Sequence, residues 1–222
     1  MKFTKMHGCG NDYIFFDPIK LSDRHKGIGG DGIVLILPSE VADARMLMYN
    51  ADGTEGSMCG NAIRCVAKYL GKDDVRIETK SGIKHITRSG ETFRVDMGAP
   101  KFLDGGIISM GNPHKVIFCD DVDKAELGAH LGNDVNTEFV QVVDWNYLKM
   151  RVWERGSGET LACGTGACAS AVAAVVAGYC DRNVDIIVEL SGGTLVINYT
   201  DETVYMTGGC NCVFNGRYNE NQ

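Results

Sequence analysis

The sequence predicts an α+β protein made of two similar, pseudo-symmetric halves, each a mixed or antiparallel sheet wrapped round a buried central helix. Strand-like segments far outnumber helix-like ones. A Gly-rich turn that ends in Cys-Gly occurs twice, as DGTEGSMCGN at 52–61 and RGSGETLACGT at 155–165. Each time, a helix-like segment with a second cysteine and then a meander of short strands follow. We therefore expect an N-terminal half at 1–104 and a C-terminal half at 105–222, with the active site in the cleft between them. The last ~10 residues are expected to pack back on the N-terminal half.

The first half is predicted to contain strands and one helix. The spacing of apolar residues indicates the type of each element, and the glycines between them indicate the turns. The run IVLIL at 33–37 is apolar throughout, which is typical of a strand buried on both faces. Ile63, Val66, Ala67 and Leu70 recur at helical spacing, and the following glycine suits a helix end. The expected elements are strands at 2–6, 13–17, 33–37 and 44–49, a helix at 61–70, and a meander at 75–78, 83–87 and 93–97.

The second half is predicted to repeat that order. Its helix is apolar almost all round, which indicates a buried helix, and Gly178 suits its end. The expected elements are strands at 115–119, 138–143 and 147–154, a helix at 166–177, and a meander at 185–190, 194–199 and 204–206.

The composition of the 222 residues excludes several classes of protein. The net charge of -7 and the scattered Lys and Arg residues argue against a nucleic-acid partner. No apolar run reaches the roughly 18 residues of a membrane span, and the first residues lack the pattern of a signal peptide. We therefore expect a cytoplasmic protein with no membrane partner and a small-molecule substrate.

The nine cysteines form no C-x-x-C pair and are odd in number. Structural disulfides are unexpected in a reducing compartment. Because the chain lacks the two C-x-x-C motifs that commonly supply zinc ligands, we also expect no metal site. Most of the cysteines are expected to be buried small apolar residues.

Cys59 and Cys163 are the exceptions, because each would stand at the first turn of a helix. Unpaired N–H groups and the helix dipole at that position are expected to lower a thiol pKa from about 8.5. The glycine that follows allows close approach of a ligand, and the N–H groups suit a carboxylate. Two such thiols on opposite faces of a carbon supply the base and the acid that invert a stereocentre. The alternative is that both cysteines are buried helix caps.

Several motifs, in order and over nearly the whole chain, resemble those of the diaminopimelate epimerase family. They are KMHGCGND at 5–12, DRH at 23–25, NADG at 50–53, MCGNAIRC at 58–65, GNPH at 111–114, VN at 135–136, ERG at 154–156, ETLACGTG at 159–166 and VYMTG at 204–208.

The resemblance implies a cofactor-independent isomerase that interconverts LL- and meso-diaminopimelate in lysine and peptidoglycan precursor biosynthesis, and a homodimer. It implies Cys59 and Cys163 as the catalytic acid/base residues, with His114 and Glu154 tuning their protonation. The implied substrate-binding residues are Asn11, Asn50, Gly60, Asn61, Asn112, Asn136, Glu154, Arg155, Gly164 and Thr165. A substrate with two amino and two carboxylate groups fits these residue types. Arg155 can bind a carboxylate, and the asparagine side chains can both donate and accept hydrogen bonds. Without the resemblance, the asparagines would be explained by a role in turns. Arg155 would be explained by a surface ion pair, and His114 by a local hydrogen bond.

Other functions stay open at this point. Gly32 stands where the family often has a substrate-contacting glutamine, and the loops near 71–76 and 100–111 are short. Because of both features, the alternative that the protein is a racemase of another amino acid, such as histidine, stays open. A cysteine hydrolase using Cys163 and His114 would leave Cys59 unexplained, and a thiol or metal-binding module is a third class.

The GIGGDG motif at 27–32 precedes a predicted strand instead of opening a helix, so it does not indicate dinucleotide binding. We also hypothesise that Cys59 and Cys163 form an inactivating disulfide when the cleft is empty.

Overall fold

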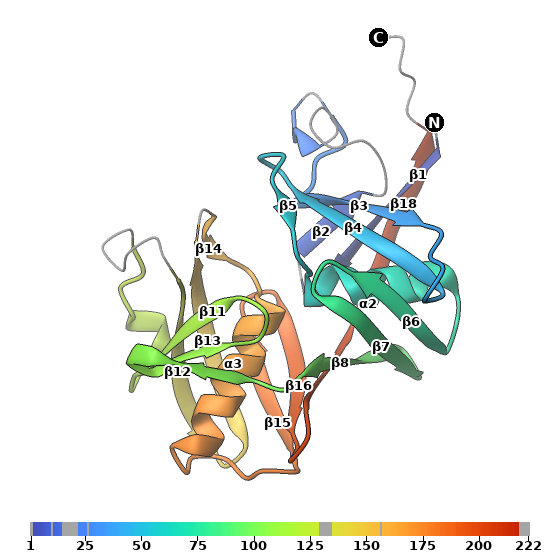
Figure 1. Ribbon diagram of the computed structural model, residues 1–222. Coiled ribbons are helices and arrows are strands. Elements are labelled where there is room, and N and C mark those ends of the chain that lie inside the picture. The colour runs from blue at the N-terminus through green and yellow to red at the C-terminus, as the bar shows by residue number, and fades with distance from the viewer. Residues whose placement is uncertain are drawn as a thin grey trace. The chain divides into compact units, whose positions relative to one another are not determined.

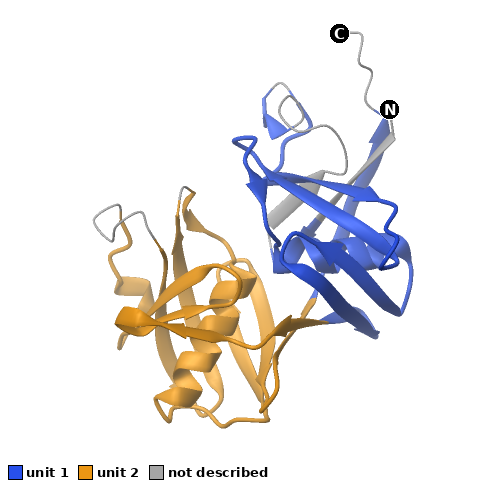
Figure 2. Cartoon of the chain, viewed as in Figure 1, with its two compact units in different colours: residues 1–94, 209–222 blue, residues 95–208 orange. Residues whose placement is uncertain are grey.

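The computed structural model describes residues 2–9, 11–14, 22–25, 27–128, 135–155 and 157–217, with the backbone alone at 2–6 and 11–14. The chain forms two compact units (Figure 2): Met1–Arg94 with Gly209–Gln222 is unit 1, and Val95–Gly208 is unit 2. The expected boundary at residue 104 thus falls inside unit 2. The division lies earlier, within β8 (Thr92–Gly98), between Arg94 and Val95.

Unit 1 contains one α-helix among strands in the part of it that the structure describes. In chain order its elements are β1 (Lys2–Gly8), β2 (Asn11–Ile14), β3 (Gly32–Leu37), β4 (Ala44–Asn50), β5 (Glu55–Gly56), α2 (Gly60–Leu70), β6 (Asp74–Thr79), β7 (Gly82–Ser89), the start of β8, and β18 (Asn211–Arg217).

Unit 2 likewise contains one α-helix among strands, together with two short 3-10 helices, in the part of it that the structure describes. They are the end of β8, β9 (Lys101–Leu103), η1 (Asp104–Gly106), β10 (Ile107–Ser109), β11 (Pro113–Phe118), η2 (Val122–Lys124), β12 (Asn136–Asp144), β13 (Tyr147–Glu154), β14 (Gly158–Thr160), α3 (Gly164–Val176), β15 (Asp185–Leu190), β16 (Gly193–Tyr199) and β17 (Val204–Gly209).

The strand pairing of the two units is equivalent, strand by strand. In unit 1, β2 pairs with β3 and β4 with β6 in parallel, while β1–β2, β3–β4, β4–β5 and β6–β7 are antiparallel. In unit 2, β11–β12 and β13–β15 are parallel, while β10–β11, β12–β13, β13–β14 and β15–β16 are antiparallel. The β18 strand joins β1, as β9 joins β10. The predicted α+β class with two similar halves is confirmed.

Each helix is enclosed by the sheet of its own unit (Figure 1). Helix α2 packs on β1 and β2, and α3 packs on strands from β10 to β16. Gly60 to Ala67 are all buried in α2, and Gly71 ends the helix in a left-handed conformation with φ 68°. Full burial of side chains such as Ile63 and Val66 stabilises the fold by roughly 1.5–3 kcal/mol each.

Two sequence predictions need correction in detail. The second helix begins at Gly164 rather than 166, because Cys163 is its N-cap. Strand β3 is buried on both faces only at its start, since Leu35 and Ile36 are half-buried and Leu37 is exposed. The short strands β5, β9, β10 and β14, and also β18, were not predicted.

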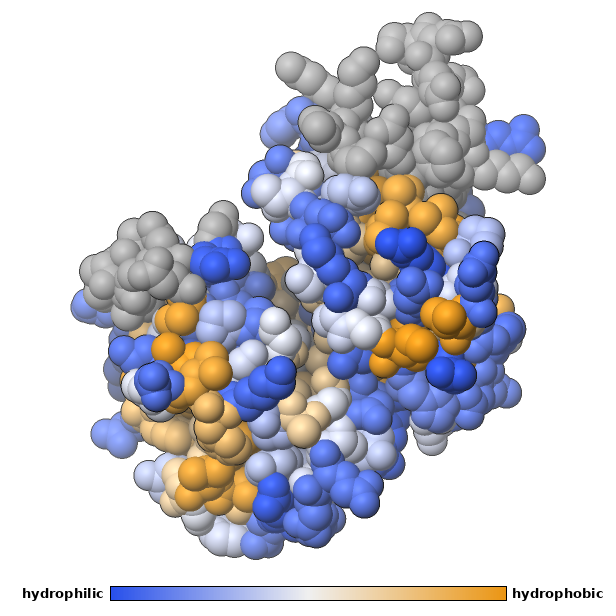
Figure 3. Space-filling view, viewed as in Figure 1, coloured by the Kyte–Doolittle hydropathy of each residue, from blue (hydrophilic) through white to orange (hydrophobic). Residues whose placement is uncertain are grey.

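The surface is mixed in character. On the face seen in Figure 3, apolar patches on both units lie between hydrophilic residues. Among the described residues, no helix combines the length and apolar character needed to cross a membrane.

Candidate active site

Cys59 and Cys163 hold the same position in their respective units. Each is the N-cap residue of its unit's α-helix, in extended backbone with φ -130° and ψ 123° at Cys59 and φ -123° and ψ 111° at Cys163. In both helices a buried glycine follows, Gly60 or Gly164, and then a buried polar residue. The Cys-Gly repeat seen in the sequence is thus a repeat in three dimensions.

The Cys163 sulfur lies in the first turn of α3. Its Sγ accepts a hydrogen bond from the Gly166 N–H at 3.4 Å and lies 3.5 Å from Thr165 Oγ1. Burial raises the pKa of the Cys163 thiol well above its ordinary value, and the nearby carboxyl groups of Glu154 and Glu138 raise it further when they are ionised. The expectation of a lowered thiol pKa is therefore wrong for Cys163. Its hydrogen bonds do favour the thiolate, but desolvation outweighs them.

His114 and Glu138 form a fully buried pair beside Cys163. Strand β11 carries His114 and the adjacent β12 carries Glu138, and both side chains have no exposed surface. His114 Nδ1 and Glu138 Oε1 are 2.7 Å apart, and His114 Nε2 is 3.1 Å from Asn112 Oδ1. The sequence-predicted His114 and Asn112 are thus hydrogen-bonded to each other.

Glu154 lies at the end of β13, within the same group of charges. Thr160 Oγ1 of β14 donates a hydrogen bond to Glu154 Oε1 at 2.5 Å. Burial raises the pKa of Glu154 and the Glu138 charge adds to this, while hydrogen bonds from Thr160 and Cys163 oppose it.

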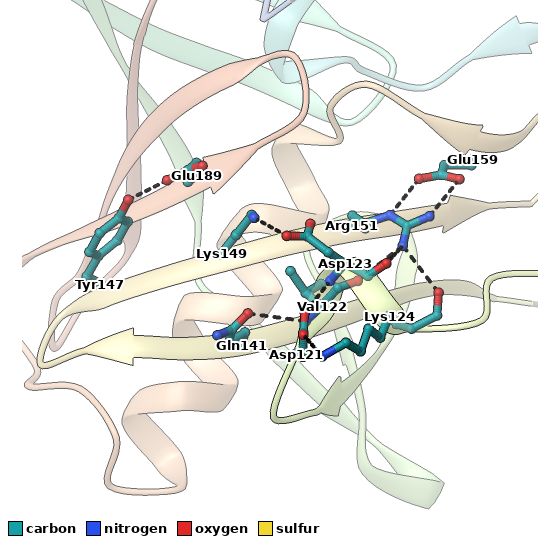
Figure 4. Close-up of polar contacts among 11 residues, drawn as sticks. Asp121, Val122, Asp123, Lys124, Gln141, Tyr147, Lys149, Arg151, Glu159 and Glu189 are labelled. Atoms are coloured by element: carbon teal, nitrogen blue, oxygen red, sulfur yellow. Dashed lines mark hydrogen bonds and ion pairs between the residues drawn. The ribbon is translucent and has the colours of Figure 1, made fainter.

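The β13–β14 hairpin that precedes Cys163 is braced by charged residues (Figure 4). Arg151 donates from Nε and Nη2 to the two carboxylate oxygens of Glu159, at 2.8 and 3.1 Å, and from Nη1 to the Val122 carbonyl at 3.1 Å. Such a bidentate pair fixes the two strands in register.

Asn136 and Arg155 are linked through the backbone. The Arg155 N–H donates to Asn136 Oδ1 at 2.8 Å, and Asn136 is buried at the start of β12, opposite His114. The Arg155 side chain is exposed, and among the described residues no carboxylate forms an ion pair with it.

In unit 1, the structure describes the side-chain contacts of two predicted residues, Asn61 in the first turn of α2 and Asn50 at the end of β4. Asn61 is buried, and its Oδ1 accepts a hydrogen bond from Arg64 Nη2 at 2.9 Å. Asn50 Nδ2 donates to Thr54 Oγ1 at 2.9 Å, so Asn50 organises the turn after β4. Asn11 lies in β2, and its side chain falls outside the described residues.

Sequence reasoning assigned no role to two buried residues that the structure places here. Glu138 contacts His114, and Arg64 donates to the Gly60 carbonyl at 3.1 Å as well as to Asn61. A glutamate next to the apolar residues Phe139 and Val140 and an arginine next to the apolar residue Ile63 of a predicted helix were signals of the two.

A metal ion would find donor atoms in one place among the described residues. Single N, O and S atoms of His114, Glu138 and Cys163 lie within 4.8 Å of one another, and zinc accepts all three types. The 2.7 Å contact between His114 and Glu138 is a hydrogen bond, however, and it holds these two atoms as proton donor and acceptor.

Comparison of the sequence with known proteins identifies one family that matches nearly the whole chain. The sequence matches the diaminopimelate epimerase family over residues 3–103 and 106–213. It is 42% identical to the diaminopimelate epimerase of Desulfovibrio desulfuricans, over 98% of both chains. It is 43% identical to that of Methanococcus maripaludis, over 97% of this chain and 99% of the other.

A similarity in structure extends further. A phenazine biosynthesis protein of the PhzF family from Bacillus anthracis has the same fold, with a TM-score of 0.78 over 99% of both chains, at 17% identity. The whole-length sequence match and the repeated Cys-Gly helix starts place this chain in the diaminopimelate epimerase family.

Proposed function

We propose that this protein interconverts LL- and meso-diaminopimelate without a cofactor, for lysine and peptidoglycan precursor synthesis. The family membership supports the substrate. The observation that carries the mechanism is the equivalence of Cys59 and Cys163, each the N-cap of a buried helix with the same backbone conformation.

In the proposed reaction the thiolate of one cysteine removes the α-hydrogen of the substrate as a proton. The thiol of the other cysteine donates its proton to the opposite face of the same carbon. One C–H bond and one S–H bond break, and one of each forms, so the cysteines exchange roles in each turnover. The proposal requires both sulfurs to come within about 3–3.5 Å of that carbon in the substrate complex.

Cys163 is the cysteine that begins as the thiol in this scheme. Burial raises the pKa of Cys163 and the nearby Glu154 raises it further, which keeps the proton on sulfur in the free protein. Cys59 is then the base in the direction of reaction in which Cys163 donates its proton to the substrate. For the reverse direction Cys163 is the base, and the hydrogen bonds from Thr165 and Gly166 stabilise its thiolate.

The substrate would be held by groups of both units. The first N–H groups of α2, at Gly60 and Asn61, and those of α3, at Gly164 and Thr165, suit a carboxylate on which charge develops as the α-proton leaves. Arg155 is free to pair with a carboxylate, and Glu154 with an ammonium group. Asn11, Asn50, Asn112 and Asn136 complete the proposed contacts.

Incubation with LL-diaminopimelate in deuterated water tests the proposal. The enzyme should form the meso isomer and introduce deuterium at the α-carbon. Cys59→Ser and Cys163→Ser should each lower the rate of epimerisation by about 1000-fold. Cys180→Ser is the matched control, because Cys180 is buried but does not precede a helix.

Three outcomes would contradict different parts of the proposal. Racemisation of another amino acid such as histidine, with no reaction of diaminopimelate, would refute the substrate. A wild-type rate in either serine variant at position 59 or 163 would refute the two-base mechanism. Hydrolysis of an ester or amide by a Cys163-dependent route would indicate a hydrolase.

The assembly and location of the enzyme are also proposed from the family. We propose a homodimer in the cytoplasm. Exposed apolar side chains such as Phe102, Trp145 and Val213 are available to an interface. Light scattering of the purified protein should give twice the chain mass of 24.1 kDa. A mass equal to one chain would refute the dimer.

A further inference from the structure

Glu138 is an ionisable residue buried where neighbouring strands carry apolar side chains. It has no exposed surface and lies in β12, between Val116 of β11 and Val152 of β13 in the strand register. Burying an unpaired carboxylate lowers the stability of the fold by roughly several kcal/mol unless its charge is neutralised. The position therefore calls for a specific role.

The hydrogen bonds of His114 show where its protons lie. Asn112 turns its amide oxygen toward His114 Nε2, and an amide oxygen only accepts, so Nε2 carries a proton. Nδ1 and Glu138 Oε1 are 2.7 Å apart, and two bare acceptors would repel at that distance. One further proton therefore lies between them, and the pair is neutral as a whole.

The second oxygen of Glu138 decides which atom holds that proton. Oε2 is buried and has no hydrogen-bond partner among the described residues. A full negative charge on the carboxyl group would be poorly solvated there, and burial raises the pKa of Glu138 more than His114 lowers it. Glu138 is thus the protonated member, and its O–H donates to His114 Nδ1.

The same carboxyl group lies against the start of α3. A Cβ atom placed on Gly166 would be 2.6 Å from Glu138 Oε1, and Gly166 is the residue whose N–H binds the Cys163 sulfur. One donor atom each of Cys163, His114 and Glu138 lies within 4.8 Å of the others. A charge on Glu138 would therefore oppose formation of the Cys163 thiolate.

We propose that Glu138 is a positioning residue for the reaction: its neutral carboxyl group fixes the proton of His114 on Nε2 and keeps the pair uncharged beside Cys163. Glu138 itself does not touch the substrate in this account. It acts by keeping the His114 Nε2–H directed at Asn112 Oδ1, and so positions Asn112. It also allows Cys163 to lose its proton, because it places no charge beside the sulfur. The inference rests on the function proposed above.

Two substitutions of Glu138 separate this role from simple packing. Glu138→Gln places an amide N–H where the carboxyl O–H lies, so it should preserve the tautomer and keep kcat within about tenfold of wild type. Glu138→Leu has no donor, and its kcat should fall about 100-fold while KM changes by less than about threefold. Thr137→Val is the matched control, since Thr137 is the neighbouring buried polar residue of β12 and its Oγ1 has no partner among the described residues.

The tautomer itself is measured by nitrogen NMR with labelled histidine, using His114→Asn to assign the signal. Wild type, Glu138→Gln and Thr137→Val should show Nε2 protonated and Nδ1 not, and Glu138→Leu should lose this preference. Wild-type kcat in Glu138→Leu, or a Gln variant as slow as the Leu variant, would overturn the inference. So would a wild-type spectrum with Nδ1 protonated, and this result needs neither turnover nor a folded Leu variant. If wild type itself exchanges no α-hydrogen, the proposed function fails, while the spectra still decide the role of Glu138.

Discussion

Asn136 Oδ1 accepts a hydrogen bond of 2.8 Å from the backbone N–H of Arg155. The ladder of β12 and β13 ends nearby, with Thr137 opposite Trp153. The side chain of Asn136 thus continues the pairing of the two strands by one more bond. It holds the backbone at the point where the exposed Arg155 side chain leaves the sheet.

Replacing Asn136 should impair substrate binding more than folding. In Asn136→Ala the Arg155 N–H loses its acceptor, and we expect KM for diaminopimelate to rise about tenfold, with a smaller fall in kcat. Steady-state kinetics measure both. Asn198→Ala is the control, because it also removes an asparagine hydrogen bond between strands of unit 2, to Asp185, away from the site. An unchanged KM in Asn136→Ala would show that this bond does not position Arg155 for binding.

Gly166→Ala should destabilise the protein. The added Cβ would lie 2.6 Å from Glu138 Oε1 and 3.2 Å from its Cδ and Cγ, and the buried carboxyl group has little room to move. Overpacking of this kind costs about 1–3 kcal/mol in the free energy of unfolding, which urea denaturation measures. Gly209→Ala is a control, since the nearest atom to its Cβ, the Glu91 carbonyl oxygen, is 4.0 Å away. Equal stability of the two variants would mean that Glu138 shifts freely.

The sequence predicted both helices and the main strands because their apolar periods are long and regular. Ile63, Val66, Ala67 and Leu70 define one face of α2, and Gly71 ends it as expected. The strands β5, β9 and β10 have only two or three residues, too few for any period to show. Strand β18 was not predicted as a strand, although the last ~10 residues were expected to pack back on the N-terminal half, because its pairing with β1 joins segments distant in sequence.

The candidate site follows from the Cys-Gly repeat, but its electrostatics could not be predicted from the sequence. A helix start alone indicates a low thiol pKa, but the burial of Cys163 beside Glu154 and Glu138 reverses the direction. These neighbours come from β12 and β13, so they are distant in sequence from the helix they affect. The role of Glu138 depends on its contact with His114, which lies 24 residues away in the sequence.

Arg64→Met should disrupt the start of α2. The buried guanidinium donates to the Gly60 carbonyl and to Asn61 Oδ1, so its loss frees two polar groups beside Cys59. We expect a loss of about 3 kcal/mol in the free energy of unfolding, together with lower kcat. Arg45→Met is the matched control, because Arg45 is half-exposed and its ion pair with Glu78 is long, at 3.9 Å. Comparable losses in the two variants would refute a special role for Arg64.

Glu154→Gln should lower the pKa of Cys163, because a carboxylate near a thiol disfavours the thiolate and the amide carries no charge. Alkylation by iodoacetamide, followed for the Cys163 peptide by mass spectrometry across a pH series, reports the fraction of thiolate. In wild type the rate at Cys163 should rise only at high pH, since burial and the Glu154 charge hold the proton on sulfur. In Glu154→Gln the rise should come at lower pH, and epimerisation should slow because the proposed ammonium contact is lost. Glu159→Gln is the control, for Glu159 lies on β14 in the same hairpin but pairs with Arg151. A pH profile of Cys163 that moves equally in both variants, or in neither, would show that the Glu154 charge does not set the protonation of this thiol.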